Sequence, residues 1–390
     1  MESPPTHRFD APACVQHGAG VRAQLPERVR EFGGTRVLLV TDPGIVKLGV
    51  AGEAVAALER AGIAVAVFDG VQPDPTDANV AQGFEALRAH RADLVVALGG
   101  GSPIDVAKVV AIRAANPEPL PAFMGLHKIA HPGLPVIAMP TTAGTGSEVT
   151  KVAVITDVGR RVKMMMLSAR LLPRAALVDY ELSLGMPKPL TAAVGVDTLT
   201  HGIEAYVSRK ANALTDPLAL QCIELTARHL RQAWAEPSNR EAREGMMLAA
   251  TLGGLAFSNS SVALVHGMSR PLGTLLHLPH GLSNAVLLPA VTRYSIPAAS
   301  ERYAAVARTV RCAAPETSAP AACAALVEWL EALNRTLEIP RLSECARQPW
   351  SRVEPELLKM AQDALASGSP AQNPRLPTPE EIAQLYREAW

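Results

Sequence analysis

The sequence predicts two domains, an α/β domain over residues 1–185 and an all-helical domain over residues 186–390. Two observations predict the first domain. Strand patterns alternate with helix patterns, and the strand patterns are near-continuous apolar runs, as expected for parallel strands buried on both faces. One observation predicts the second domain, because only helix patterns follow residue 186. The length of 390 residues allows two domains with full hydrophobic cores.

The α/β domain begins with a turn-rich segment in which residues 14–21 can hold an edge strand. A β-branched apolar run at 36–42 follows, and it predicts a parallel strand that is buried on both faces. The segments after it alternate in the manner of βαβ units. Further strand patterns lie at 64–68, 93–98 and 134–140, and helix patterns lie at 51–61 and 76–90.

The all-helical domain is predicted by apolar residues that recur at helical spacing. We place its boundary near residue 186, where the strand patterns end. The Gly, Ser and Pro residues at 367–374 predict a loop. The helix patterns cover 190–208, 217–235, 239–257, 300–310, 319–333, 354–366 and 379–389.

The composition excludes several classes of function. Acids and bases are equal at 37 each, and no Lys/Arg cluster provides the basic patch that binds nucleic acid or a membrane surface. No apolar stretch reaches the length of a membrane span, and the five cysteines show no metal or disulfide spacing. The N-terminus lacks a targeting pattern. These features predict a cytoplasmic protein whose partner is a small molecule.

Four residues between positions 197 and 280 can bind one metal ion. Asp197 and His201 stand at i and i+4, so on a helix their side chains share one face about 6 Å apart. His266 follows in a helix-like apolar run, and His280 comes directly after a proline. One carboxylate and three imidazoles suit Fe²⁺ or Zn²⁺ and leave room for a substrate oxygen. The alternative is a set of helix caps, hydrogen-bonded core imidazoles or surface groups.

Three consecutive glycines directly follow the strand pattern at 93–98. Gly99, Gly100 and Gly101 let the backbone approach a ligand without Cβ clashes. Ser102 and the start of the next helix offer N–H groups to a pyrophosphate. An ordinary tight turn between strand and helix is the alternative. The pattern is not Gly-x-Gly-x-x-Gly, so it differs from the ordinary dinucleotide-binding motif.

A second polar loop follows the strand pattern at 134–140. Its hydroxyls and glycines, over residues 141–150, can hydrogen-bond phosphate, ribose or the nicotinamide amide, although a solvent-exposed Ser/Thr loop is about as common. Asp42 ends the first strand pattern, where a carboxylate can accept a hydrogen bond from a ribose hydroxyl and repel a 2′-phosphate. An aspartate there is also common as a turn residue or helix N-cap.

These motifs stand in one order along the chain: the glycine turn, Pro-Thr-Thr-Ala-Gly-Thr-Gly-Ser-Glu, Gly-Val-Asp-x3-His-x-Ile-Glu-Ala-Tyr, His-Gly-Met and Pro-His-Gly. In this combination the chain resembles the iron-dependent (group III) alcohol dehydrogenases, the family that contains lactaldehyde reductase and propanediol dehydrogenases. The resemblance covers nearly the whole chain. It implies a dehydroquinate synthase-like fold with a dinucleotide-binding α/β domain, a helical domain for metal and substrate, and an active site in the cleft between them.

The resemblance also implies cofactors, a homodimer and site residues. Asp42 predicts NAD, because relatives that prefer NADP tend to have Gly there. The implied metal is Fe²⁺, with Zn²⁺ as the alternative. The implied metal ligands are Asp197, His201, His266 and His280. The implied cofactor positions are Asp42, Asp74, Gly99, Gly100, Gly101, Ser102, Asp105, Thr141, Thr142, Thr145, Thr150 and Lys163.

One motif departs from the family. Many relatives read His-x-Met-x-His, with the second His proposed to act in proton transfer, whereas this chain has Arg270 at that position. Arg270 stays protonated and cannot act as an ordinary proton shuttle. Either protons leave through water and the ribose hydroxyls, or the substrate differs. Because a guanidinium matches a carboxylate, we hypothesise that Arg270 binds an acidic group of the substrate; the alternative is a pair with a protein carboxylate.

The predicted reaction is reversible hydride transfer between nicotinamide and a small alcohol or aldehyde, including one that bears a carboxylate, with the metal as Lewis acid. Maleylacetate reductase is the nearest alternative, although those enzymes generally do not depend on a metal. A lyase of the dehydroquinate synthase type shares the fold, but its basic residues for a phosphorylated substrate are not evident. A non-catalytic binding protein is the third alternative.

Overall fold

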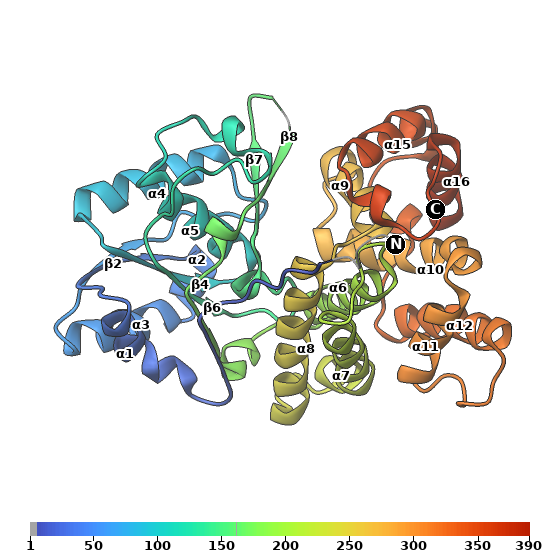
Figure 1. Ribbon diagram of the computed structural model, residues 1–390, viewed down its shortest axis with the longest axis horizontal. Coiled ribbons are helices and arrows are strands. Elements are labelled where there is room, and N and C mark those ends of the chain that lie inside the picture. The colour runs from blue at the N-terminus through green and yellow to red at the C-terminus, as the bar shows by residue number, and fades with distance from the viewer. Residues whose placement is uncertain (1–5, 161) are drawn as a thin grey trace. The chain divides into compact units, whose positions relative to one another are not determined.

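The computed structural model describes residues 6–160 and 162–390, which divide into two compact units. One unit spans Asp10–Gly185 and holds every strand in the described part of the chain. The other unit comprises Met186–Trp390 with the described residues up to Phe9, and it consists of helices and loops (Figure 1). A strand-and-helix unit followed by helices confirms the fold class predicted from the sequence.

A six-stranded parallel sheet forms the centre of the α/β unit. Its order is β1-β9-β6-β4-β2-β3, and every neighbouring pair of strands is parallel. The sequence does not predict β9, because four residues that include two alanines give a weak strand pattern. The other five strands are predicted. The strands are β1 (Cys14–His17), β2 (Arg36–Val40), β3 (Ala64–Phe68), β4 (Leu94–Gly99), β6 (Val136–Pro140) and β9 (Ala175–Val178).

Helices cover both faces of this sheet. On one face lie α4 (Asp77–His90) and α5 (Gly101–Arg113), and on the other lie α1 (Leu25–Glu31), α2 (Pro43–Lys47) and α3 (Val50–Arg60) (Figure 1). The sheet therefore separates two hydrophobic cores.

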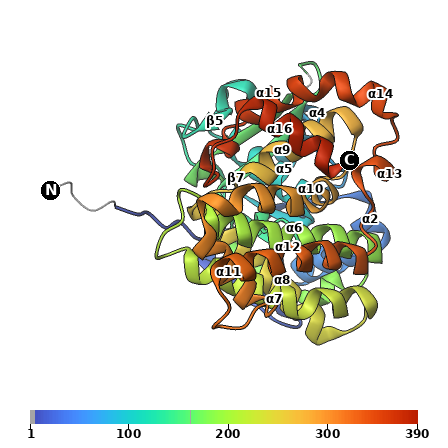
Figure 2. The ribbon, with the colours of Figure 1, turned by 90° about the vertical axis from the view of Figure 1, so that its right-hand side faces the viewer.

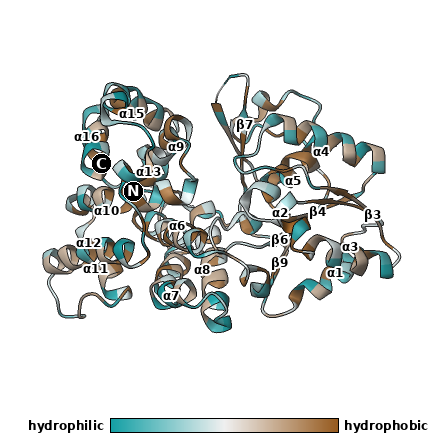
Figure 3. Ribbon diagram, turned by 180° about the vertical axis from the view of Figure 1, so that it is seen from behind, coloured by the Kyte–Doolittle hydropathy of each residue, from teal (hydrophilic) through white to brown (hydrophobic). Residues whose placement is uncertain are grey.

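The strands serve both cores, which explains their near-continuous apolar sequence. Within β2, Leu38 and Val40 enter the core beneath α4 and α5, whereas Val37 and Leu39 enter the core beneath α1 and α3. Every residue of β4 is buried, and Figure 3 shows the central strands in the colour of hydrophobic residues. A polar side chain in the middle of these strands would have no access to water on either face.

A second sheet of three strands belongs to the same unit. β7 (Val152–Asp157) pairs antiparallel with β8 (Val162–Leu167), and β5 (Gly125–Leu126) pairs parallel with β8. Ala153 and Ile155 of β7 pack into the core that also contains α5. The sequence does not predict this sheet, because the methionine run of β8 mostly lacks the β-branched and aromatic residues that favour strands.

The helical unit is centred on α6 (Lys188–Val207). Every residue of α6 from Gly195 to Val207 is buried, and α7, α8, α9 and α10 all pack against it. Figure 2 faces this unit and shows α11 and α12 lying side by side. The predicted helix patterns correspond to α6, α7, α8, α11, α12, α15 and α16. The helices after α6 are α7 (Asp216–Ala235), α8 (Arg240–Asn259), α9 (Leu264–Leu276), α10 (His280–Ser295), α11 (Ser300–Thr309), α12 (Ala319–Thr336), α13 (Leu342–Cys345), α14 (Trp350–Val353), α15 (Leu357–Ala366) and α16 (Pro379–Ala389).

Two glycines let α6 and α7 approach each other closely. A Cβ added at Gly195 would lie 2.2 Å from Leu230 Cδ1, and one added at Gly202 would lie 2.8 Å from Ile223 Cγ1. Real Cβ atoms do not tolerate such distances, so larger residues would push the helices apart. The close contact keeps the middle of α6 in the interior of the unit.

In the described part of the chain, no single helix is long and apolar enough to cross a membrane. Only α8 and α9 taken together reach that length and composition, and they are bent by 103° at the break between them.

Candidate metal centre and dinucleotide loops

The structure brings together the four residues that the sequence proposes as metal ligands. Asp197 and His201 lie one turn apart on α6, His266 lies on α9, and His280 is the first residue of α10. Asp197 Oδ1 is 3.8 Å from His201 Nε2 and 3.6 Å from His266 Nε2. It is 3.9 Å from His280 Nε2. The carboxylate of Asp197 is thus the common neighbour of the three imidazoles.

These distances fit a shared metal ion. Two nitrogen or oxygen ligands, each about 2.1 Å from one ion at a tetrahedral angle, lie about 3.4 Å apart. One ligand atom from each of Asp197, His201 and His266 lies within 4.8 Å of the other two, and all three residues are buried. The ring of His280 is 42% exposed. The donor set therefore suits a borderline divalent ion, and its His280 side is open.

Ring packing holds the imidazoles of this centre. The His201 ring stacks on Phe257 at 4.4 Å and on His266 at 4.7 Å between ring centroids. The rings of His266 and His280 are 5.2 Å apart. Gly253 on α8 adds a backing surface, since a Cβ there would lie 3.5 Å from the Cβ of His201. These contacts restrict the rotamers of the candidate ligands.

Glu204 on α6 fixes the orientation of His266. Its Oε2 lies 2.7 Å from His266 Nδ1, so the Nδ1–H donates to the carboxylate and the Nε2 lone pair faces Asp197. Glu204 also accepts the backbone N–H groups of Ala263 at 2.7 Å and Val265 at 2.6 Å, where α9 begins. The carboxylate therefore satisfies otherwise unpaired donors at a helix N-terminus.

Glu204 belongs to the motif Gly-Val-Asp-x3-His-x-Ile-Glu-Ala-Tyr, but its role is not predicted from the sequence. The spacing of Glu204 along the helix could have indicated a role. Glu204 follows His201 by three residues and Asp197 by seven, so all three side chains share one face of α6. A buried acid on the same helix face as two ligand candidates is a reasonable partner for a third. Asn284 is not predicted either, although it lies four residues after His280 on α10.

Arg270 lies on α9, one turn after His266. Its guanidinium donates to the carbonyl oxygen of Ser367 at 3.3 Å and to Ser369 Oγ at 3.2 Å. Burial lowers the pKa of Arg270, and the negative charge of Glu204 opposes that shift. The contacts tie α9 to the start of the short 3-10 helix Ser369–Gln372.

The glycine turn and the second polar loop contact each other in the α/β unit. Gly99 ends β4 at φ 152°, a backbone conformation that disfavours residues with a Cβ. A Cβ at Gly100 would lie 3.3 Å from Thr142 Oγ1, and one at Gly101 would lie 2.9 Å from Thr145 Cγ2. The backbone N–H of Thr141 donates to the carbonyl of Gly99 at 3.0 Å.

The turn ends at the N-terminus of α5, with Gly100 as the N-cap and Ser102 as the second helical residue. The first backbone N–H groups of a helix have no partner within the helix, so they can bind an anion. Asp42 reaches the same place, because a Cβ at Gly99 would lie 3.3 Å from Asp42 Oδ2. Asp42 also caps α2, with its Oδ1 accepting the N–H groups of Gly44 and Ile45.

Two residues proposed for cofactor binding, Asp105 and Thr150, join a buried network beneath the loops. Lys108 is fully buried and donates to Ser147 Oγ at 2.9 Å, Thr150 Oγ1 at 3.1 Å and the carbonyl of Val152 at 2.9 Å. Asp105 accepts from Ser147 Oγ at 2.6 Å. Burial lowers the pKa of Lys108 to about 8 and raises the pKa of Asp105.

Asp74 and Lys163 pair with each other. The loop after β3 holds Asp74 in a left-handed conformation, with φ 53°, and β8 carries Lys163. The Lys163 Nζ lies 2.6 Å from Asp74 Oδ1. The pair links the loop to the β7–β8 hairpin, to which the bridge between Thr76 and Thr156 also belongs.

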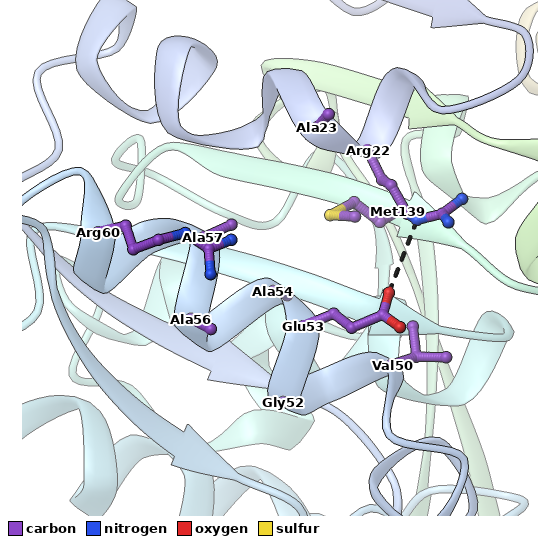
Figure 4. A pocket seen from close by; sticks show the side chains of 10 residues that line it. All are labelled: Arg22, Ala23, Val50, Gly52, Glu53, Ala54, Ala56, Ala57, Arg60 and Met139. Atoms are coloured by element: carbon purple, nitrogen blue, oxygen red, sulfur yellow. Dashed lines mark ion pairs between the residues drawn. The ribbon is translucent and has the colours of Figure 1, made fainter.

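A separate pocket of about 530 Å³ lies between α3 and the residues that precede α1 (Figure 4). Arg22 and Glu53 face each other across it at 3.9 Å, and alanines of α3 form much of its wall. None of the residues that line it belongs to the ligand and cofactor positions predicted from the sequence.

Comparison with known proteins identifies the family. The sequence pattern of the family described as "Iron-containing alcohol dehydrogenase" matches residues 12–180, and that of "Fe-containing alcohol dehydrogenase family, C-terminal" matches residues 191–390. The chain belongs to the iron-containing alcohol dehydrogenase family. This confirms the resemblance, and it confirms the prediction of an oxidoreductase of the alcohol dehydrogenase type.

Relatives of this alcohol dehydrogenase extend over its whole length. The 1,3-propanediol dehydrogenase of Citrobacter freundii is 41% identical over 375 residues, with 96% of each chain covered. The crystal structure of a 1,3-propanediol oxidoreductase, 39% identical, superposes with a TM-score of 0.96 over 99% of this chain and 100% of that one. A sulfoacetaldehyde reductase from Bifidobacterium kashiwanohense in complex with NAD+ is 28% identical, with a TM-score of 0.87 and 99% of each chain covered.

The buried lysine gives this alcohol dehydrogenase a specific dependence of stability on pH. The pKa of Lys108 is about 8 in the folded chain, below the ordinary 10.5. Between these values the unfolded chain binds a proton that the folded chain does not bind, so the free energy of unfolding rises with pH. The rise amounts to at most about 3 kcal/mol at ~1.4 kcal/mol per pKa unit. Denaturant unfolding of the Lys108→Met variant, from pH 8 to 10.5, should lack this rise.

A matched control is Lys359→Met, because Lys359 is exposed on α15 and pairs only locally with Asp363. This control variant should keep the rise of the parent protein. If the free energy of unfolding changes equally with pH in Lys108→Met and in the parent over this range, Lys108 does not titrate there.

Proposed function

We propose that this chain is an NAD-dependent, metal-dependent alcohol dehydrogenase that transfers a hydride between NAD(H) and a small alcohol or aldehyde. The observation that carries the proposal is that the imidazole Nε2 atoms of His201, His266 and His280 all lie within 3.9 Å of the buried Oδ1 of Asp197. The family membership of the chain supports the reaction type. In this proposal, residues 1–185 form a domain that binds the dinucleotide, and residues 186–390 form a domain that binds the metal and the substrate.

Fe²⁺ is the proposed metal. Zn²⁺ is the alternative, because it also binds nitrogen and oxygen ligands. Asp197, His201, His266 and His280 hold the metal. When bound, the metal supplies a Lewis acid for the oxygen of the alcohol or aldehyde. Glu204 keeps the Nε2 of His266 turned toward the site. The reaction needs no side-chain nucleophile.

NAD(H) is the proposed cofactor, and it supplies the hydride. The glycine turn Gly99–Gly101 lets a pyrophosphate approach the N-terminus of α5. Asp42 lies beside this turn, where a carboxylate favours a free 2′-hydroxyl over a 2′-phosphate. The hydroxyls of Thr141, Thr142 and Thr145 can donate hydrogen bonds to the other polar groups of NAD(H) and accept hydrogen bonds from them. The NAD+ complex of the sulfoacetaldehyde reductase supports this choice.

The alternative functions differ from this proposal in observable ways. A reductase of the maleylacetate type would work without metal, whereas the buried group of Asp197, His201 and His266, with His280 beside Asp197, favours a metal enzyme. A lyase of the dehydroquinate synthase type would regenerate its NAD in each turnover, so it would not consume NADH. A non-catalytic binding protein would neither oxidise NADH nor convert a substrate.

The proposal includes a cytoplasmic homodimer. None of the five cysteines, all of them in the described part of the chain, forms a disulfide, which fits a reducing compartment. Strand β1 is one of the two edge strands of the six-stranded sheet, and its Val15 is exposed, so pairing with a second copy would cover that edge. Light scattering of the purified protein measures the subunit number.

Anaerobic loading with Fe²⁺ tests the function. The loaded protein should oxidise NADH in the presence of a short-chain aldehyde and should hold one ion per chain. Removal of the ion with a chelator, or the substitution Asp197→Ala, should lower the rate by about 100-fold or more, because the Lewis acid is lost. A rate that is the same with and without metal would contradict the proposal, as would turnover without net oxidation of NADH.

Substitution of Asp42 tests the cofactor choice. Asp42→Gly and Asp42→Ser both remove the charge that repels a 2′-phosphate, so each should raise the NADPH to NADH ratio of kcat/KM by about ten-fold or more. The two variants separate charge from capping. Serine still caps α2, whereas glycine loses the side-chain cap, so only Asp42→Gly should lower stability. An unchanged cofactor ratio in both variants would assign Asp42 to capping alone.

An aldehyde that bears an acidic group is the second candidate substrate class, and Arg270 favours it. Arg270 projects from the same face of α9 as His266, one turn later, and its charge is permanent. One similar structure is a reductase of sulfoacetaldehyde, an aldehyde with an acidic group. The contacts of Arg270 with Ser367 and Ser369 support a structural role instead, and the substrate comparison distinguishes the two.

The comparison uses neutral and carboxylated aldehydes of equal length. Arg270→Gln should raise the KM of the carboxylated aldehyde by about ten-fold or more and change that of the neutral one much less, because only the former loses a charge-assisted hydrogen bond. Arg243→Gln is the matched control, since Arg243 is a buried arginine bound to Thr191 and to the carbonyl of Met186. If Arg270→Gln leaves the KM of the carboxylated aldehyde unchanged, Arg270 is structural.

A further inference from the structure

Asn284 lies at the centre of the candidate metal ligands without being one of them. It is fully buried on α10, one turn after His280, so both side chains share one face of the helix. Its Nδ2 is 2.6 Å from Asp197 Oδ1. The same nitrogen is 3.2 Å from the Nε2 of His266 and 3.2 Å from the Nε2 of His280. One amide nitrogen thus contacts ligand atoms from three different helices.

The amide nitrogen of Asn284 is a hydrogen-bond donor that is surrounded by potential acceptor atoms. A carboxamide nitrogen has two N–H groups, so it can donate to two of the three atoms at a time. The carboxylate of Asp197 is the strongest acceptor and also the nearest, at 2.6 Å. Since Glu204 takes the Nδ1–H of His266, its Nε2 offers a lone pair to the same point. Acceptor atoms of Asp197 and His266, with His280 Nε2 beside them, suit a cation, and the amide of Asn284 lies on one side of this group.

The other end of the amide supports a special role. Asn284 Oδ1 is buried and has no hydrogen-bond partner among the described residues. Such an atom costs free energy, and the hydrogen bond from Nδ2 to Asp197 Oδ1 offsets that cost and holds the amide in this orientation. Asn373 is the contrast in the same unit. It is also buried, but its Nδ2 donates to Ser295 Oγ at 2.9 Å and to the carbonyl of Arg375 at 2.8 Å, as in an ordinary structural asparagine.

We propose that Asn284 is a positioning residue of the metal centre. Its N–H group donates to Asp197 Oδ1 and fixes the plane of that carboxylate, so that Asp197 offers the metal one defined oxygen beside His266 and His280. The amide also closes one side of the ligand group, which leaves the exposed side at His280 for substrate. This inference rests on the proposed function, because it assumes that the four ligands bind a metal.

The metal dissociation constant tests the inference independently of turnover. Asn284→Ala removes the donor, and Asn373→Ala removes a buried asparagine that lies outside α10 and hydrogen-bonds to Ser295, the last residue of α10. Competition with a chelator should show that Asn284→Ala weakens binding of Fe²⁺ or Co²⁺ by about ten- to hundred-fold, as loss of a group that orients ligands does. Asn373→Ala should lower the melting temperature while its dissociation constant stays within about two-fold of the parent, since it touches no ligand.

A second variant keeps the test valid if the alanine variant fails to fold. Asn284→Asp has the same shape but replaces an N–H donor by an oxygen that can approach the metal. With Co²⁺ bound, its visible absorption spectrum should differ from that of the parent, because spectrum and coordination geometry change together. Dissociation constants and spectra equal to those of the parent in both Asn284 variants would overturn the inference.

The outcomes also separate this inference from the proposed function. If the parent protein binds no metal, or if Asp197→Ala binds it as tightly as the parent, the proposed metal function is wrong. If the parent binds one ion per chain and loses it in Asp197→Ala, while Asn284→Ala binds as tightly as the parent, only the role of Asn284 is wrong.

Discussion

The helical unit depends on one constraint, which is that two carboxylates of α6 lie in its interior. Asp197 and Glu204 are 1% and 3% exposed, and buried charges require close compensation. Glu204 receives it from the N-terminus of α9 and from His266, and Asp197 receives it from the amide N–H of Asn284. The helices that pack on α6 therefore place polar groups beside Asp197 and Glu204. The groups around Asp197 can form a metal centre.

The same constraint explains why α9 and α10 begin where they do. The two N–H groups at the start of α9 point at Glu204, and α10 begins with His280 itself. Each helix start thus places one imidazole against Asp197. Small residues on α6 permit the tight packing beneath, because Gly195 and Gly202 leave no Cβ against α7. Packing and polar compensation reinforce each other here, so a change in either would displace the candidate ligands.

In the α/β unit a buried cation has the corresponding role. Lys108 holds the loop residues Ser147 and Thr150 against α5, while the glycine turn on the same helix contacts Thr142 and Thr145. The two loops are therefore a single structure with an internal ammonium group. Their glycines are needed because the neighbouring threonines occupy the space of a Cβ. The glycine turn and Lys108 belong to one short segment of chain, and the second loop supplies the hydroxyls that contact them.

Much of this protein follows from local sequence. Apolar runs determine β2, β4 and β6, because strands buried on both faces allow few other residues, and helical spacing determines α6, α7 and α8. The short β9 and the methionine-rich β8 escape prediction, since their pairing with neighbouring strands rather than their own residues makes them strands.

Spacing along one helix likewise pairs Asp197 with His201 by itself. Only the tertiary structure decides that His266 and His280 meet them, that Glu204 orients His266, and that Asn284 faces Asp197. These contacts join residues that are far apart in the chain, and the close packing of α6, α9 and α10 creates them, so no local pattern can contain them.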